Sequence, residues 1–216
     1  MTLAEQLQAY RQGFREKVAE NIQDTMGAAT AALKESGILD GVASEGQQPP
    51  DFELPNAQGQ PVRLSEKLKA GPVVVTFYRG QWCPYCNLEL KALQNALPEF
   101  EKRGAQLIAV SPQTPDNSLS TTEKNELTFE VLSDVGNQVA QQYGLVFTLP
   151  EELRPIYASF GIDVPAHNGD DTFELPIPAT YVIGKDGAIA LAVADADYTQ
   201  RAEPEAIIAA LDKLSN

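Results

Sequence analysis

The apolar run at positions 72–78, Pro-Val-Val-Val-Thr-Phe-Tyr, is the feature that most constrains the fold. An unbroken stretch of β-branched and aromatic residues is typical of a strand that is buried on both faces of a sheet. Leucines recur at helical spacing from 88 to 97, and a second apolar run follows at 106–110. Strand, helix and strand in this order predict a βαβ unit.

The rest of the chain predicts further strands and helices around this unit. Turn residues at 56–59 and 184–187 lie between apolar segments and predict two hairpins, at 51–64 and 179–193. Helices are expected at 116–124, 135–143 and 203–214, a strand at 129–132, and an irregular insertion at 145–174. The predicted fold class is therefore an α/β three-layer sandwich with a mixed central sheet.

The first 34 residues have an amphipathic pattern. Apolar side chains recur every three or four positions, at Leu3, Leu7, Tyr10, Phe14, Val18, Ile22 and Met26. This spacing predicts one long helix over 3–34, and Gly-Gln-Gln-Pro-Pro at 46–50 predicts a linker. The chain thus divides into a helical extension at 1–48 and a main domain at 49–216. We expect the apolar stripe to pack on the main domain; the alternative is a partner interface, such as a homodimer.

The charge balance restricts the partners. The chain has 216 residues, enough to bury a core without disulfide staples, and a formal net charge of −14. This excess of negative charge disfavours nucleic acid and anionic membranes. No apolar stretch is long enough for a membrane span, and the first residues lack the layout of a signal peptide. We therefore expect a cytoplasmic protein.

The two cysteines are three residues apart, in Cys83-Pro84-Tyr85-Cys86. In a cytoplasmic chain this spacing indicates metal binding or redox chemistry more often than a structural bridge. A structural zinc site needs four ligands, and the sequence adds only one histidine, His167, which we interpret as a surface residue. We therefore expect neither a metal nor a cofactor, and we interpret the pair as redox-active.

The predicted position of Cys83, between a buried strand and the next helix, favours its thiolate. Free backbone N–H groups and the positive end of the helix dipole lie there, and they lower the pKa of a thiol. Pro84 suits the first turn of a helix because its missing N–H costs nothing at that position. Cys86 lies one turn further on the same face. We expect Cys83 to be the attacking sulfur and Cys86 its resolving partner.

Neighbouring residues are further candidates for substrate binding or thiolate stabilisation. Arg79 either stabilises the thiolate, binds an anionic substrate, or is a solvated loop cation. Gly80 allows a close approach of the backbone to a substrate, or simply serves the turn. Trp82 lies directly before the cysteine motif and Tyr85 lies within it, and these two aromatic residues complete the candidate site.

The segment Phe77-Tyr-Arg-Gly-Gln-Trp-Cys-Pro-Tyr-Cys-Asn-Leu-Glu-Leu90 resembles the active-site segment of the peroxiredoxin-like branch of the alkyl hydroperoxide reductase and thiol-specific antioxidant (AhpC/TSA) superfamily. Similar likenesses at 51–64, 131–144 and 180–187 extend the resemblance over about 49–214. The resemblance implies a thioredoxin-like fold and reduction of hydroperoxides by a peroxidatic Cys83, with Cys86 resolving. It also implies an electron donor of the thioredoxin or glutaredoxin/glutathione type.

Three positions depart from the family pattern. Typical peroxiredoxins carry Thr or Ser three residues before the peroxidatic cysteine and Pro four residues earlier, where this chain has Gly80 and Thr76. They also carry an arginine where this chain has Pro178. Cleavage of an oxygen–oxygen bond needs donors aimed at the peroxide. The candidates to replace the missing donors are Arg79 and, from elsewhere in the chain, Arg154 or Arg201.

Pro178 introduces a second resemblance. The segment Ile177-Pro178-Ala179-Thr180 is similar to the cis-proline loop that faces the cysteine pair of thioredoxins, so we expect a cis bond before Pro178. The buried acid of thioredoxins is absent from the active-site strand, where Thr76 stands. Three functions remain open: a thiol peroxidase, a dithiol–disulfide oxidoreductase, and a non-enzymatic redox sensor that binds a partner through the N-terminal helix.

Overall fold

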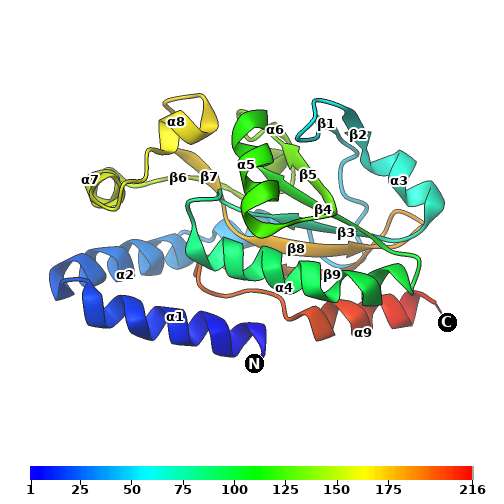
Figure 1. The fold of residues 1–216 in the computed structure, drawn as a ribbon, viewed down its shortest axis with the longest axis horizontal. Helices are drawn as coiled ribbons and strands as arrows, with labels where there is room; N and C mark the ends of the chain where they lie inside the picture. The colour runs from blue at the N-terminus through cyan, green and yellow to red at the C-terminus, as the bar shows by residue number, and fades with distance from the viewer. Residues whose placement is uncertain (216) are drawn as a thin grey trace.

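A five-stranded mixed sheet forms the centre of the protein in the computed structural model, which describes residues 1–215 (Figure 1). Its strands stand in the order β5-β4-β3-β8-β9. β3 (Val73–Phe77), β4 (Gln106–Ser111) and β5 (Glu130–Ser133) are parallel, whereas β8 (Ala179–Ile183) and β9 (Ile189–Ala194) form an antiparallel hairpin next to β3. The predicted βαβ unit, late hairpin and mixed sheet are confirmed.

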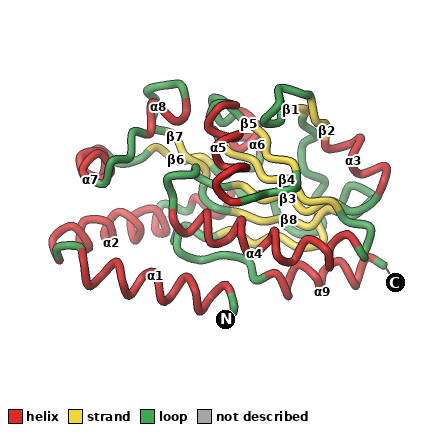
Figure 2. Tube along the Cα trace, in the orientation of Figure 1, coloured by secondary structure: helices red, strands yellow, loops and turns green. Residues whose placement is uncertain are grey.

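Helices cover both faces of the sheet, which lies between them in Figure 2. α4 (Pro84–Glu101) and α9 (Pro204–Leu214) pack side by side on one face. The other face is covered by α3 (Leu64–Ala70), α6 (Gln138–Gln142) and the hairpin of β1 (Glu53–Pro55) and β2 (Pro61–Arg63). No helix within residues 1–215 is long and apolar enough to cross a bilayer.

Side chains that alternate along β3 divide the core into two layers. Val73, Val75 and Phe77 pack on the side of α3 and α6, whereas Val74 packs on the side of α4 and α9 against Leu93. All five are fully buried. β3 is therefore the central strand, and its carboxyl end delivers the chain to the edge of the parallel strands, where α/β folds place their sites.

The N-terminal extension is a helical hairpin, so the prediction of one helix over 3–34 is wrong. α1 (Leu3–Lys17) ends where Val18 adopts an extended backbone, and α2 (Glu20–Glu35) begins two residues later. The side-chain amide of Gln23 donates to the carbonyls of Arg15 and Val18, at 2.9 and 2.7 Å, and satisfies acceptors at the end of α1. An unbroken helix would run straight for about 48 Å, whereas the turn brings both apolar faces back to the main domain.

Both helices of the hairpin contact the main domain (Figure 1). Leu3 and Leu7 of α1 are buried in the cluster that contains Cys83, and α1 packs along α4. Met26 of α2 packs on the cluster around Leu149, and the short helix η1 (Ile38–Gly41) leads into the main domain. The apolar stripe thus packs as expected, and contact with a partner stays a prediction.

The insertion at 145–174, expected to be irregular, contains regular elements. They are β6 (Val146–Thr148), η2 (Glu151–Leu153), α7 (Arg154–Ser159), α8 (Val164–Asn168) and β7 (Glu174–Pro176), and β6 pairs with β7. α7 and α8 each carry a proline in the first turn, where proline starts a helix. α5 (Pro115–Asn125), predicted at 116–124, also begins with proline and packs against β5.

No peptide bond within residues 1–215 is cis, so the expectation of a cis bond before Pro178 is wrong. The Ile177 N–H donates to the Leu145 carbonyl at 2.8 Å, and Ala179 pairs with Phe77 in the central sheet. These contacts hold the chain extended on both sides of Pro178 as it passes from β7 into β8, and a trans bond maintains that direction.

We predict that Gly144→Ala destabilises the fold more than Gly187→Ala. Both glycines have φ in the left-handed region, at +74° and +85°, which costs alanine about 1–2 kcal/mol. A Cβ on Gly144 would also lie 2.1 Å from the Gly41 carbonyl oxygen, whereas one on Gly187 meets no atom within 4 Å. Overpacking of this kind adds about 1–3 kcal/mol.

Thermal unfolding measures this difference. The Tm of Gly144→Ala should lie at least about 2 °C below that of Gly187→Ala, since 1 kcal/mol corresponds to about 2–4 °C at this chain length. Equal Tm values would show that the extension does not press on the main domain at Gly41.

Candidate active site

Buried polar groups hold the turn between β3 and the first cysteine. The Cys83 N–H donates to the Gly80 carbonyl at 3.1 Å, and the Gln81 N–H donates to the side chain of Gln113 at 2.9 Å. Gln113 is itself fully buried. The turn ends with Cys83 as the N-cap residue of α4 and Pro84 in its first turn, as the sequence predicts.

Gly80 is required by the conformation of this turn. Its φ is +153°, and a Cβ there would lie 2.4 Å from Nε1 of Trp82. Both the backbone and the packing of the indole therefore exclude a side chain. Position 80 therefore cannot hold the Thr or Ser of typical peroxiredoxins, because the indole ring of Trp82 packs against the backbone there.

Both cysteines are buried thiols, with 2% of Cys83 and 0% of Cys86 exposed. Burial alone raises the pKa of Cys83, but a hydrogen bond from the Cys86 thiol, the charges of Arg79 and Arg201, and the Cys86 backbone N–H outweigh it and lower the pKa to about 6. Burial, the hydrogen bond and the Cys83 charge raise the pKa of Cys86 well above its ordinary value. At neutral pH Cys83 is therefore a thiolate and Cys86 a thiol that donates to it.

Arg79 is a buried cation enclosed by aromatic rings. Its guanidinium carbon lies 5.0, 5.5 and 4.8 Å from the ring centroids of Trp82, Tyr157 and Tyr198. One Nη donates to the Tyr157 hydroxyl, and Nε has no acceptor among residues 1–215. Aromatic faces attract a cation without neutralising it. Arg79 is therefore not a solvated loop cation, and its charge acts on Cys83.

A buried ion pair lies next to the second cysteine. Nε of Arg201 donates to Glu89 Oε2 at 2.6 Å, and each side chain is 1% exposed. Nη2 of the same arginine donates to Sγ of Cys86 at 3.4 Å. Arg201 thus contacts the second cysteine and lowers the pKa of the first by its charge.

Arg154, the other candidate from elsewhere in the chain, is held at a different place. Its guanidinium carbon lies 4.3 Å from the ring centroid of Phe173, and Nε donates to the Leu149 carbonyl at 3.2 Å. The structure therefore brings Arg79 and Arg201 to the cysteines and leaves Arg154 in the insertion.

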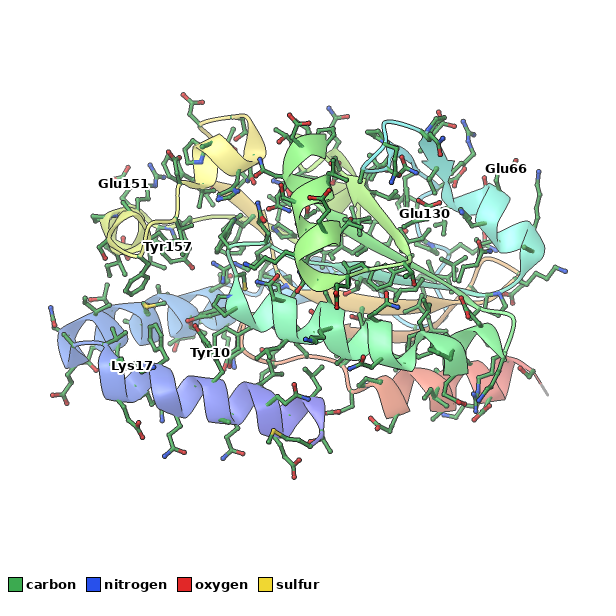
Figure 3. All side chains as sticks on the ribbon, in the orientation of Figure 1. Tyr10, Lys17, Glu66, Glu130, Glu151 and Tyr157 are labelled. Carbon is green, nitrogen blue, oxygen red and sulfur yellow. The ribbon has the colours of Figure 1, made fainter. Side chains whose placement is uncertain are left out.

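A cavity of about 560 Å³ lies in front of Cys83. Aromatic residues of α1 and of the insertion make up much of its wall, including Tyr10, Phe14, Tyr157 and Phe160. Tyr10 projects from α1 toward α4, and Tyr157 projects from α7 toward the helical hairpin (Figure 3). The helical hairpin therefore closes a largely apolar space over the thiolate.

The remaining candidates line different cavities. Trp82, Pro84 and Tyr85 line the cavity that contains Cys83. Pro178 lines a smaller cavity of about 220 Å³, together with Arg79 and residues of α2. Pro178 also lines a cavity of about 230 Å³ with Glu89 and Arg201, so it lies outside the cavity that contains Cys83.

Sequence analysis missed Glu89, Tyr157 and Tyr198. Glu89 lies three residues after Cys86 and four before Leu93, so it shares the buried stripe of α4, and a carboxylate in such a stripe is the signal that could have found it. No sequence signal marks Tyr157 and Tyr198, because they come from separate loops and short helices that only the fold brings to Arg79.

The sequence is similar to a known family and to known proteins. A profile described as the AhpC/TSA family matches residues 46–192. The chain belongs to this family. Peroxiredoxin Q of Sedum lineare is 31% identical over 176 residues, which are 82% of this chain and 79% of that protein. Peroxiredoxin Q of Populus jackii is 31% identical over 75% of this chain and 63% of its own length. Both relatives are described as chloroplastic.

Solved structures support the same fold. Peroxidoxin BcpB of Mycobacterium tuberculosis has a TM-score of 0.62 at 24% identity and covers 79% of this chain and 97% of its own. A bacterioferritin comigratory protein of Xanthomonas campestris, described for its alkyl peroxide reduction activity, has a TM-score of 0.56 at 18% identity and covers 76% and 92%. The thioredoxin-like fold is confirmed.

Family membership and the cysteine pair together identify the chemistry. Members of this family that match the chain are peroxiredoxins, and the two cysteines lie within hydrogen-bond reach of each other. The chain is therefore an enzyme of the thiol-dependent peroxidase class, which removes the non-enzymatic sensor as an alternative. Within residues 1–215 no three His, Cys, Asp or Glu side chains form a group that could hold a metal ion.

We predict that Arg79→Met raises the pKa of Cys83. Methionine keeps an apolar chain among the three rings but removes the charge, and loss of an opposite charge at this range shifts a pKa by about 1 unit or more. The rate of Cys83 alkylation by iodoacetamide, followed by peptide mass spectrometry across pH, should therefore inflect near pH 7 or above instead of near 6.

Arg154→Met is the matched control, because it removes the same charge from the insertion. Its alkylation profile should coincide with that of the unmodified protein. An Arg79→Met profile that also coincides would show that Arg79 does not stabilise the thiolate.

Proposed function

We propose that the protein reduces hydroperoxides, and preferentially alkyl hydroperoxides, with Cys83 as the peroxidatic and Cys86 as the resolving cysteine. The observation that carries the proposal is the low pKa of Cys83 at the wall of a largely apolar cavity. A thiolate is the form of cysteine that attacks, and this one faces a space that can receive a carbon chain.

The reaction proceeds in two steps at sulfur. The Cys83 thiolate attacks one oxygen of ROOH, the oxygen–oxygen bond breaks, and the alkoxide leaves with a proton as ROH. Arg79, beside the thiolate, is placed to stabilise the charge that moves onto the leaving oxygen. Cys86 then attacks the Cys83 sulfenic acid, and water leaves as the disulfide forms.

Residues of the helical hairpin support the alkyl preference. Tyr10 and Phe14 of α1 line the cavity, so a substrate in contact with Cys83 also contacts apolar rings. Burial of a carbon chain there contributes about 0.8 kcal/mol per CH₂ group. The Xanthomonas campestris relative is described as reducing alkyl peroxides. Hydrogen peroxide reaches the same sulfur but gains nothing from these rings.

A thioredoxin-type reductant fits the recycling of the disulfide, with a glutaredoxin/glutathione-type donor as the alternative. Reduction assays with each donor decide between them. A cytoplasmic location and a homodimer through the N-terminal helical hairpin stay predictions.

Dithiol–disulfide exchange is the second candidate function. The buried cysteine pair has the connectivity for it, but both sulfurs lie beneath the helical hairpin, which hinders a protein disulfide from approaching. We expect slow reduction of insulin disulfides compared with reduction of peroxide.

We predict that Cys83→Ser abolishes peroxidase turnover and that Cys86→Ser permits one oxidation. The serine hydroxyl at position 83 does not ionise near neutral pH, whereas the Cys86 variant retains the thiolate and stops at the sulfenic acid. Mass spectrometry after peroxide and dimedone should show one dimedone adduct in Cys86→Ser and none in Cys83→Ser. Fast peroxide consumption by Cys83→Ser would contradict the assignment.

We also predict that Gly13→Phe lowers kcat/KM for cumene hydroperoxide about tenfold or more. The value of kcat/KM for hydrogen peroxide should stay nearly unchanged. A loss of apolar contact worth about 1.4 kcal/mol corresponds to a factor of ten. Gly13 lines the Cys83 cavity, and a Cβ there meets no atom within 4 Å, so the ring enters the space intended for the alkyl group.

Gln12→Phe is the matched control, because Gln12 is exposed and lines a different groove. It should leave both substrates unaffected. An equal loss for both peroxides in Gly13→Phe would show that the cavity does not select the alkyl group.

A further inference from the structure

Glu89 is a buried carboxylate to which the proposed reaction gives no role. It lies on α4, one helical turn after Cys86 and on the same face, and its side chain is 1% exposed. Carboxylates are rarely buried without a partner or a task. The groups around Glu89 therefore indicate its role.

Arg201 places the carboxylate beside the sulfur of Cys86. The guanidinium group is a rigid planar fork, and its Nε–H and one Nη2–H point in the same direction from one edge. Glu89 Oε2 accepts from Nε at 2.6 Å, and Cys86 Sγ accepts from Nη2 at 3.4 Å. The two acceptors bind to adjacent nitrogens of one guanidinium, and the charge of Cys86 acts on the pKa of Glu89, so the carboxylate and the sulfur are neighbours.

We propose that Glu89 accepts the proton of the Cys86 thiol when Cys86 attacks the sulfenic acid of Cys83. This inference rests on the proposed function. Arg201 makes the transfer favourable, because the negative charge moves from Oε2 to Sγ along the same edge of one cation. Arg201 itself remains protonated and only positions the two groups.

The step balances in atoms and electrons. Cys86 Sγ loses its proton to Glu89 and forms a bond to Cys83 Sγ, while the bond between Cys83 Sγ and the hydroxyl oxygen breaks. The hydroxide that leaves takes up a proton and becomes water, and Glu89 returns to its ionised state when it releases the proton to that hydroxide or to solvent. In this step Cys86 is oxidised and the sulfenic sulfur of Cys83, which the peroxide oxidised before, is reduced to the disulfide level.

The surroundings of Glu89 suit proton exchange near neutral pH. Arg201 and Cys86 are the charged or titratable groups that act on it, Thr180 donates to its other oxygen at 3.3 Å, and Asp195 lines the same cavity of about 230 Å³. Burial raises the pKa of Glu89 to about 7 against the opposing charge of Arg201. The carboxylate accepts a proton only when ionised, so the resolving step should accelerate as pH rises through about 7.

Trp82, the one tryptophan of the sequence, allows the two steps to be followed separately, because it directly precedes Cys83. Stopped-flow fluorescence of the full chain with excess cumene hydroperoxide should show a peroxide-dependent phase and a peroxide-independent phase. In Glu89→Gln we expect the first phase to change less than about threefold and the second to slow by about 100-fold, the range of a general base. The inflection of the second phase near pH 7 should vanish.

A purely structural or electrostatic role of Glu89 predicts the opposite result. Without the carboxylate, the charge of Arg201 acts on Cys86 alone, which favours the Cys86 thiolate and accelerates the second phase. A second phase in Glu89→Gln that is unchanged or faster, or one that retains the inflection near pH 7, would therefore overturn the proposal. Absence of a peroxide-dependent phase in the unmodified protein would instead refute the proposed function.

Two further variants complete the test. Glu99→Gln is the matched control, since it removes a paired carboxylate from the exposed face of the same helix, and it should leave both phases unchanged. If Glu89→Gln fails to fold because Arg201 is left unpaired, Glu89→Gln combined with Arg201→Gln removes both buried charges. The double variant should also lose the inflection near pH 7; an inflection that persists would overturn the proposal.

Discussion

Two buried guanidinium groups next to the cysteine pair determine the chemistry of this protein. Arg79 and Arg201 carry two positive charges into an interior that contains the ionised Cys83 and the carboxylate of Glu89. Burial disfavours each of these charges when it stands alone. The positive and negative groups are therefore stable in their charged forms only because they stabilise one another. The low pKa of Cys83 is the consequence of this balance rather than of any single contact. Formation of the disulfide removes one negative charge and leaves the two cations less well compensated, so the arrangement favours the reduced form.

The fold supplies each group from a different element, and this explains why the arrangement is rigid. β3 delivers Arg79 two residues after its end, α4 begins directly after Cys83 and carries Cys86 and Glu89 on one face, and Arg201 lies just before α9. α4 and α9 pack side by side on the sheet, which holds Arg201 against α4. The rings of Tyr157 and Tyr198 fill the space around Arg79 without supplying a negative charge.

The central part of the fold could be predicted from the sequence because periodic patterns encode it. The run at 72–78, the leucines of α4 and the two late strands all have the predicted type and nearly the predicted bounds. The break of the N-terminal helix could not be predicted in this way, since Val18 continues the apolar period and only packing on the main domain decides that the chain turns there. The insertion, predicted to be irregular, contains short helices instead, and Pro155 and Pro165 lie in the first turns of two of them.

In the candidate site, too, some features follow from local sequence and others depend on tertiary contacts. The position of Cys83 at the start of α4 follows from local sequence, whereas the choice between Arg154 and Arg201 depends on tertiary contacts over more than 100 residues along the chain. Pro178 was misjudged because a local resemblance to thioredoxins carried no information on the strand pairing that keeps its peptide bond trans.

The helical hairpin lies outside residues 46–192, the part of the chain that matches the family profile, and yet it lines the space in front of Cys83. One wall of this space thus comes from outside the stretch that carries the cysteines, while Tyr157 and Phe160 of the insertion supply another. Changes within the first forty residues can therefore alter which molecules reach the sulfur without changing the catalytic core. Relatives that share this fold can diversify in this way.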